Sequence, residues 1–112
     1  MNNEDIESLV KKYQEIQESL QNIVIEREQY KAQIKLLDSS KSAIQNSNGK
    51  IFKYIGNVLV ETDKESAIKE IDESSELLQL RLSTIEKSYQ ELSKQEKELR
   101  EKLNSYVKSN KQ

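Results

Sequence analysis

The side chains that could do chemistry in this chain are mainly carboxylates, because its 112 residues include neither cysteine nor histidine. Disulfide bonds, thiolate nucleophiles, imidazole bases and most zinc or iron sites are thereby excluded. Two groups of acids are close enough in sequence to attract a hard cation: Asp72, Glu73 and Glu76, and Glu96, Glu98 and Glu101. On a helix, this spacing spreads the carboxylates over solvated faces, so we expect no metal site.

The remaining composition argues against an enzyme. The chain has no glycine-rich phosphate-binding loop and no nucleophile paired with a base, so we expect neither catalysis nor a cofactor. Its 18 basic and 20 acidic side chains leave a net charge of −2, which does not favour binding to nucleic acid or to an anionic membrane. An acidic start and the lack of a run of about 20 apolar residues lead us to expect a soluble, cytoplasmic protein.

Two stretches carry apolar residues at alternating steps of three and four, the a/d pattern of a coiled coil. The first comprises Ile6, Leu9, Tyr13, Ile16, Leu20, Ile23, Arg27, Tyr30, Ile34, Leu37, Lys41 and Ile44. The second comprises Ile68, Ile71, Ser75, Leu78, Leu82, Ile85, Tyr89, Leu92, Glu96, Leu99, Leu103 and Tyr106. We call these positions the seam. We expect the long side chains of Arg27, Lys41 and Glu96 to extend from it into solvent and Ser75 to tolerate burial, with a role in setting the helix register as the alternative.

A different pattern separates the two stretches. Two β-prone runs, Ile51–Ile55 and Val58–Glu61, flank Gly56-Asn57, a dipeptide suited to a tight primed turn. The polar segment Asn46–Gly49 ends the first helix, and Thr62–Glu65 reads as a capping box that starts the second. The sequence therefore predicts a helix over about 3–45, a β hairpin over about 50–61 and a helix over about 63–109, within a single domain of residues 1–112.

We therefore expect a mainly α fold, in which a long antiparallel two-helix coiled coil is joined through a central β hairpin. The turn lies near the middle of the chain, so residues whose numbers sum to about 113 should lie at one level, and both termini should meet at one end. Leu36 and Leu77 lie outside the seam at one such level. We expect them to widen the apolar contact near the hairpin.

The hairpin predicts assembly. An isolated two-stranded hairpin is marginal in water, and this one is apolar and has unpaired strand edges. Neighbouring hairpins would satisfy those edges, so we expect an oligomer formed through residues 51–61.

These features together resemble the β-class subunits of prefoldin, particularly the archaeal type. The resemblance is most specific over residues 51–61, IFKYIGNVLVE, and continues in residues 76–82, ELLQLRL. It implies a hexamer of two α-class and four β-class subunits, whose hairpins join into a β-barrel platform. The implied assembly residues are Ile51, Phe52, Tyr54, Ile55, Gly56, Val58, Leu59 and Val60.

The resemblance also implies an ATP-independent holding chaperone, whose coiled-coil tips capture unfolded proteins and pass them to a group II chaperonin. The residues that we expect to contact a client are Ile6, Leu9, Val10, Tyr13, Leu99, Leu103, Tyr106 and Val107. Acids and bases are segregated near the termini, where Glu4, Asp5 and Glu7 could pair with Lys102, Lys108 and Lys111. Such exposed pairs contribute at most about 1 kcal/mol, so we expect the tip to fray.

A structural or scaffolding coiled coil that binds one defined partner is the alternative. Periodicity alone does not exclude it, whereas the apolar central hairpin argues against it. A general chaperone should suppress the aggregation of unrelated clients, and a scaffold should protect at most its own partner.

Overall fold

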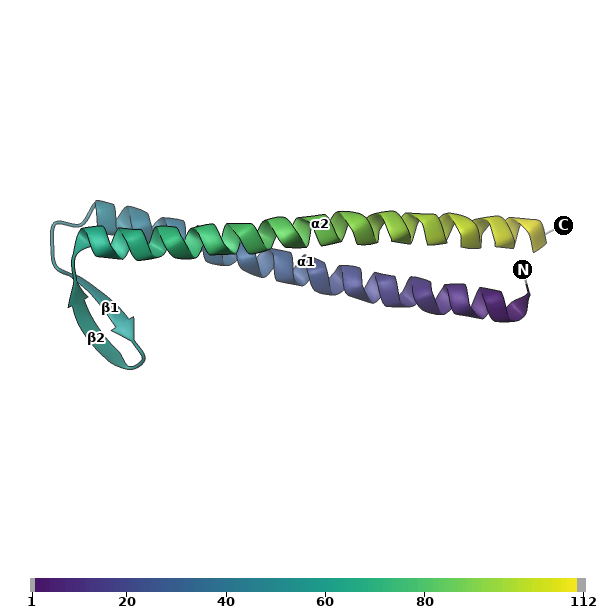
Figure 1. The fold of residues 1–112 in the computed structure, drawn as a ribbon, viewed down its shortest axis with the longest axis horizontal. Coiled ribbons are helices and arrows are strands. Elements are labelled where there is room, and N and C mark those ends of the chain that lie inside the picture. Colours follow the sequence, from purple (N-terminus) through teal and green to yellow (C-terminus); the bar gives the residue numbers. More distant parts are fainter. Residues whose placement is uncertain (1, 111–112) are drawn as a thin grey trace. The chain divides into compact units, whose positions relative to one another are not determined.

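A computed structural model describes residues 2–110 of the chain. Helix α1 (Asn3–Gln45) is followed by strand β1 (Ile51–Ile55), strand β2 (Val58–Thr62) and helix α2 (Lys64–Asn110), as Figure 1 shows. The expectation of a mainly helical fold with a central antiparallel hairpin is confirmed. Among the described residues, no helix is long and apolar enough to cross a membrane.

Local hydrogen bonds define where α1 begins and ends. The side-chain oxygen of Asn2 accepts a hydrogen bond from the backbone N–H of Asp5 at 2.9 Å, which caps the first turn. At the other end, the Nζ of Lys64 donates to the carbonyl oxygens of Gln45 and Ser47, at 2.8 and 3.1 Å. The Lys64 cation at the start of α2 thus satisfies carbonyl groups at and just after the end of α1. The last turn of α1 has no basic residue of its own.

The start of α2 differs from the predicted capping box. Thr62 belongs to β2, and the capping residue is Asp63. Its carboxylate accepts hydrogen bonds from the backbone N–H of Ser66 at 2.7 Å and from the Ser66 hydroxyl at 2.8 Å. These two bonds hold the pKa of Asp63 below its ordinary value. The prediction was one residue early because two adjacent residues, Thr62 and Asp63, are both good caps.

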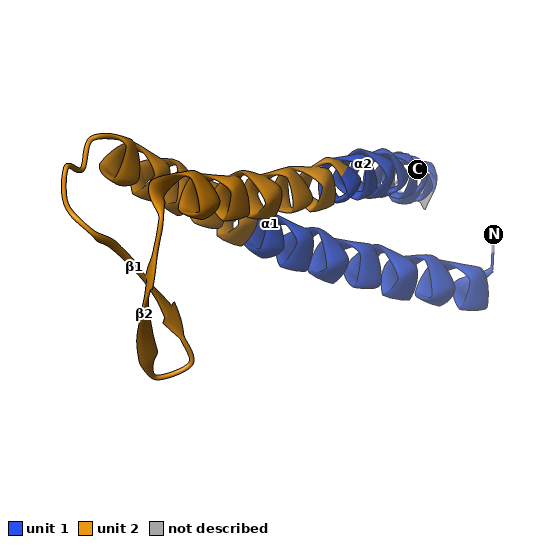
Figure 2. Cartoon of the chain, turned by 60° about the vertical axis from the view of Figure 1, so that its left-hand side comes forward, with its two compact units in different colours: residues 1–27, 84–112 blue, residues 28–83 orange. Residues whose placement is uncertain are grey.

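The chain divides into two compact units, coloured separately in Figure 2. Unit 1 contains residues 1–27 and 84–112, and unit 2 contains residues 28–83 with the hairpin. In each unit, segments of α1 and α2 pack antiparallel along the seam. Ile16 and Leu99 are the most buried apolar side chains of unit 1, and Ala67 is that of unit 2.

The polar seam residues do not all behave as predicted. The Arg27 guanidinium lies 4.7 Å from the centre of the Tyr89 ring, and its Nε is 3.7 Å from the Glu86 carboxylate. The side chains of Arg27 and Glu96 are only 20% and 15% exposed. The prediction that they extend into solvent is wrong, because partners on the facing or the same helix hold them inside. Ser75 is buried and accepts a hydrogen bond from Gln79.

Candidate functional site

The hairpin of unit 2 has two dissimilar faces. Its strands pair antiparallel, with Ile51 opposite Thr62, Lys53 opposite Val60 and Tyr54 opposite Leu59. Because side chains alternate along a strand, Ile51, Lys53, Val60 and Thr62 share one face, and all four are partly buried. Phe52, Tyr54, Leu59 and Glu61 share the other face and are exposed. The hairpin therefore presents an apolar surface that its own chain does not cover.

Near its turn, the hairpin also exposes apolar side chains of the other face. Gly56 has a φ of 60°, and no other described residue has a positive φ. A positive φ at the first central residue only is typical of a two-residue turn of type II′, in which that residue is glycine. Ile55 and Val58 pair beside the turn and belong, by the alternation of side chains, to the same face as Ile51 and Lys53, yet both are exposed. Among the described residues, each strand pairs with only one other strand, so the outer edges remain open.

Specific contacts attach the hairpin to the helices of unit 2. The Nζ of Lys53 lies 2.8 Å from the Glu70 carboxylate, which ties β1 to α2. A groove runs between them, lined by Leu37, Ile44, Ile51, Phe52, Lys53, Thr62, Ala67, Glu70, Ile71 and Ser74. Sequence analysis did not identify the Lys53–Glu70 pair, because seventeen positions separate the two residues and neither lies on the seam.

Leu36 and Leu77 do not pack as predicted. Lys41 and Asp72, whose numbers sum to 113, form an ion pair at 2.7 Å, so residues 36 and 77 also lie at one level of unit 2. Nevertheless, Leu36 is 68% exposed and Leu77 is 49% exposed. They do not add to the apolar core of this chain, because both project from the side of the helix pair instead of from the seam.

The eight predicted client-binding residues all belong to unit 1. Val10 and Val107 are exposed, whereas Leu99 is buried in the seam. The other five are partly buried: Ile6, Leu9, Tyr13, Leu103 and Tyr106. Only the two valines are therefore accessible for binding without a change in the packing of the helices. We refer to the eight residues together as the tip residues.

A polar cluster interrupts the apolar seam beside the tip residues. The Tyr13 hydroxyl donates a hydrogen bond to the Glu96 carboxylate at 3.1 Å, and Gln17 donates to the Tyr13 oxygen at 2.8 Å. Arg100 lies 3.7 Å from the same carboxylate. The cluster joins α1 to α2 and satisfies a half-buried acid. Sequence analysis missed it, although the a position of Glu96 was a signal.

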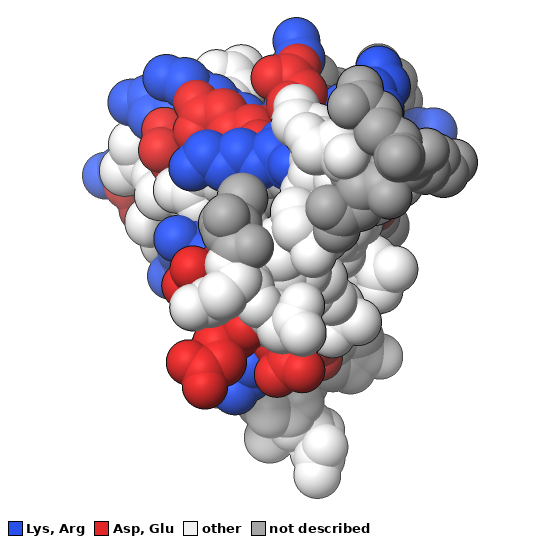
Figure 3. Space-filling view, turned by 90° about the vertical axis from the view of Figure 1, so that its right-hand side faces the viewer, with Lys and Arg blue, Asp and Glu red and all other residues white. Residues whose placement is uncertain are grey.

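The expected pairing of terminal charges is not observed among the described residues. Glu4, Asp5 and Glu7 form no ion pair with Lys102 or Lys108, and Lys111 lies outside the described residues. On the face drawn in Figure 3, basic and acidic side chains lie next to one another, with uncharged surface beside them. This mixture does not produce a broad area of one charge on the described part of that face.

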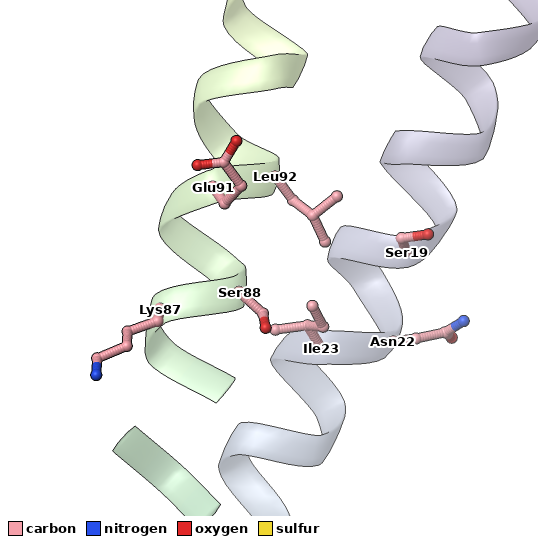
Figure 4. A pocket seen from close by; sticks show the side chains of 7 residues that line it. All are labelled: Ser19, Asn22, Ile23, Lys87, Ser88, Glu91 and Leu92. Atoms are coloured by element: carbon pink, nitrogen blue, oxygen red, sulfur yellow. The ribbon is translucent and has the colours of Figure 1, made fainter. Parts of the chain in front are cut away.

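Unit 1 also has two open grooves along its helices. The first is lined by Ser19, Asn22, Ile23, Lys87, Ser88, Glu91 and Leu92. Figure 4 shows Ile23 and Leu92 directed between the helices, with Asn22 and Lys87 directed away. The second is lined by Gln17, Leu20, Gln21, Val24, Ile25 and Tyr89, and neither groove was predicted from the sequence. Neither groove brings together the residues of a catalytic or metal site, and no group of acids in the described residues could hold a metal ion.

Known proteins resemble this chain over both helices and the hairpin. A family model described as "Prefoldin subunit" matches residues 7–110. A protein named prefoldin subunit beta from Pyrobaculum calidifontis is 33% identical over 101 residues, which cover 88% of this chain and 81% of the relative. The prefoldin subunit beta of Saccharolobus islandicus is 28% identical over 105 residues, covering 92% and 83%.

Two solved structures are also similar. The crystal structure of the prefoldin beta subunit from Thermococcus strain KS-1 matches with a TM-score of 0.85 and 22% identity, and the match covers 91% of each chain. That of the prefoldin beta2 subunit from the same strain has a TM-score of 0.52 and 26% identity, covering 86% of this chain and 97% of the other. The first likeness supports the same arrangement of helices and hairpin.

Proposed function

This chain belongs to the prefoldin family of chaperone subunits, and we propose that it acts in an ATP-independent holding chaperone, which captures unfolded proteins and passes them to a group II chaperonin. The observation that carries the proposal is the exposed apolar hairpin, which needs neighbouring subunits, in a chain of this family. In this proposal residues 1–112 act as a single prefoldin-like domain in the cytoplasm, and they catalyse no reaction.

Assembly is the first part of the proposal. The complex contains four copies of this chain and two α-class prefoldin subunits, joined through Ile51, Phe52, Tyr54, Ile55, Gly56, Val58, Leu59 and Val60. Open strand edges accept further strands through backbone hydrogen bonds, and the exposed apolar side chains then pack against one another. Burying that surface contributes about 25 cal/mol per Å² before the entropic costs of association.

Client capture is the second part. Unfolded proteins expose apolar segments, which bind the accessible side chains of Val10 and Val107 first. Fraying of the helix ends then exposes the other tip residues, because half-buried contacts near helix ends open at a low free-energy cost. One tip binds weakly, but several tips on one complex raise the avidity by roughly 10² to 10⁴.

The first experiment measures the native mass of the complex that co-purifies with the full-length chain from its own host. We expect four copies of this chain with two copies of an α-class subunit. The purified complex should suppress the aggregation of several unrelated denatured clients without nucleotide. Protection of a single partner only would instead favour a scaffolding coiled coil.

A second experiment tests the tip residues. The double variant Val10→Ser/Val107→Ser should suppress client aggregation less well than the unsubstituted complex, with an unchanged native mass. Ile25→Ser is the matched control, because Ile25 is also an exposed apolar residue of unit 1. An equal loss in the control would show that the tip residues have no special role in capture.

A further inference from the structure

The helix pair of unit 2 has two flanks of opposite composition beside the seam. Heptad positions are counted with Ile34 and Ile68 as a positions. In an antiparallel pair, positions c and g of both helices lie on one flank, and positions b and e lie on the other. Over residues 33–43 and 67–77, the c/g flank consists of Gln33, Leu36, Ser40, Ala43, Ala67, Glu70, Ser74 and Leu77. The b/e flank consists of Lys35, Asp38, Ser42, Lys69, Asp72 and Glu76. The c/g flank thus contains a single ionisable residue, Glu70. The b/e flank contains a single residue that is not ionisable, Ser42.

The hairpin of this chain lies on the c/g flank. The groove beneath it is lined on α2 by Ala67, Glu70 and Ser74, which are all c or g positions, together with the seam residue Ile71. Glu70, the ionisable residue of this flank, is paired with Lys53. Lys53 is itself the one charged residue of the hairpin between positions 51 and 60. The pair balances both charges, and Glu61 at the far end of β2 lies 3.9 Å from Lys50.

Leu36 and Leu77 continue this flank next to the hairpin. Both occupy c positions, at one level of the helix pair, and both are largely exposed. Leu77 is three residues beyond Ser74 on α2, a step of about 4.5 Å along the helix.

We propose that Leu36 and Leu77 form a docking surface for the β hairpin of a neighbouring prefoldin subunit. The proposal rests on the proposed function, because it assumes that hairpins of several subunits join at their open edges. A hairpin added there brings a second largely apolar surface against a flank whose one acid, Glu70, is already paired with Lys53. The flank thus extends the assembly interface from the strands onto the helices, and α1 and α2 take part in joining subunits.

Photo-crosslinking in the intact complex tests which molecule covers the flank. Leu36→p-benzoylphenylalanine and Leu77→p-benzoylphenylalanine should each crosslink to hairpin residues of another subunit. Lys35→p-benzoylphenylalanine, an exposed position on the b/e flank, is the matched control and should not crosslink there. Crosslinks from 36 and 77 to bound clients, or to no protein, would overturn the proposal.

Substitution tests the contribution of the two leucines to assembly. Leu36→Ser/Leu77→Ser should raise the dissociation constant of the complex about ten-fold or more, because two partly buried leucines are lost from the interface. Leu80→Ser is the control: it is an exposed leucine of the same helix at an f position, between the two flanks. An equal dissociation constant for the double variant and the control would contradict the proposal.

The experiment separates this inference from the proposed function. If the unsubstituted chain forms no complex through its hairpin, the proposed function itself fails. If the unsubstituted chain forms the complex but positions 36 and 77 do not crosslink to a neighbouring hairpin and the double variant binds as well as its control, only the proposed docking surface is wrong. Circular dichroism of each variant shows whether its helices are retained. The crosslinking test does not depend on the serine variants, so it stands even if those variants unfold.

Discussion

Glu96 shows how a single polar residue can be accommodated in an apolar seam. Its carboxylate accepts a hydrogen bond from Tyr13 and lies near Arg100, so half-burial does not leave the charge unsatisfied. Tyr13 is itself a tip residue, and Arg100 directly follows the tip residue Leu99. The cluster therefore joins the two helices next to Ile16 and Leu99, the most buried apolar side chains of unit 1.

Tyr13→Phe should reduce the free energy of unfolding by roughly 1 kcal/mol, because it removes the hydroxyl and little else. Tyr106→Phe is the matched control, since no hydrogen bond is observed for the hydroxyl of that half-buried seam tyrosine among the described residues. Urea unfolding at a fixed protein concentration measures both. Equal effects of the two substitutions would show that the cluster contributes nothing specific.

Asp63 provides a pH-dependent contribution at the start of α2. The pKa of its carboxyl is lowered in the folded protein by the two hydrogen bonds from Ser66. A lowered pKa means that this contribution is fully present above the ordinary value of 3.8 and is lost as the pH falls through the lowered pKa. Asp63→Asn keeps an acceptor without the charge.

We therefore expect the parent chain to be more stable than Asp63→Asn near neutral pH, with the difference shrinking as the pH falls below 3.8. Thermal unfolding at a series of pH values measures this difference. A difference that stays constant down to pH values of about 2 would argue against the hydrogen-bonded carboxylate as its cause.

At the scale of elements, the hairpin depends on one backbone conformation. Gly56 has a positive φ, and no atom lies within 4 Å of where a Cβ would be. Any cost of a side chain at this position is therefore backbone strain and not a steric clash. Gly49, in the segment before β1, has no such φ, which makes the two glycines a natural comparison.

Gly56→Ala should destabilise the folded chain by roughly 1–2 kcal/mol, which is the cost of a left-handed conformation for an L-residue. Gly49→Ala should be neutral or slightly stabilising, because the nearest atom to the added Cβ would be the Ser47 hydroxyl oxygen, 4.0 Å away. Differential scanning calorimetry of both variants checks the contrast. A similar melting temperature for the two would show that the turn tolerates alanine.

At the scale of the whole molecule, assembly and client capture depend on different units. The proposed assembly residues and the docking leucines lie in unit 2, and the tip residues lie in unit 1. If multivalency provides the affinity for clients, a change confined to unit 2 should weaken capture without altering any tip residue.

Phe52→Ser/Leu59→Ser should therefore lower the mass of the complex and also reduce client affinity by roughly 10² to 10⁴. Val10→Ser/Val107→Ser should reduce affinity without lowering the mass. Native mass spectrometry and client titration on the same samples measure both quantities. Full client affinity in a chain that no longer assembles would show that one tip is sufficient.

Much of this architecture could be predicted because it depends on local patterns. The steps of three and four predicted both helices, and β-prone runs around Gly56-Asn57 predicted the hairpin. The capping residue of α2, the Lys53–Glu70 pair and the retention of Glu96 could not be predicted in this way. Each depends on which of several suitable partners lies close in space. The tip and assembly residues stay predictions.

The sequence by itself determined the seam, the hairpin and its apolar character, because periodicity and intrinsic propensity act over a few neighbouring residues. Only the tertiary structure decided which flank of the helix pair the hairpin covers and which of its faces remains exposed. Heptad positions define the side of each helix that faces the other helix. They do not define which flank the hairpin covers, because that depends on how the chain between α1 and α2 folds. The backbone geometry of that connection and the Lys53–Glu70 contact select the c/g flank, and this leaves Leu36 and Leu77 exposed beside the hairpin.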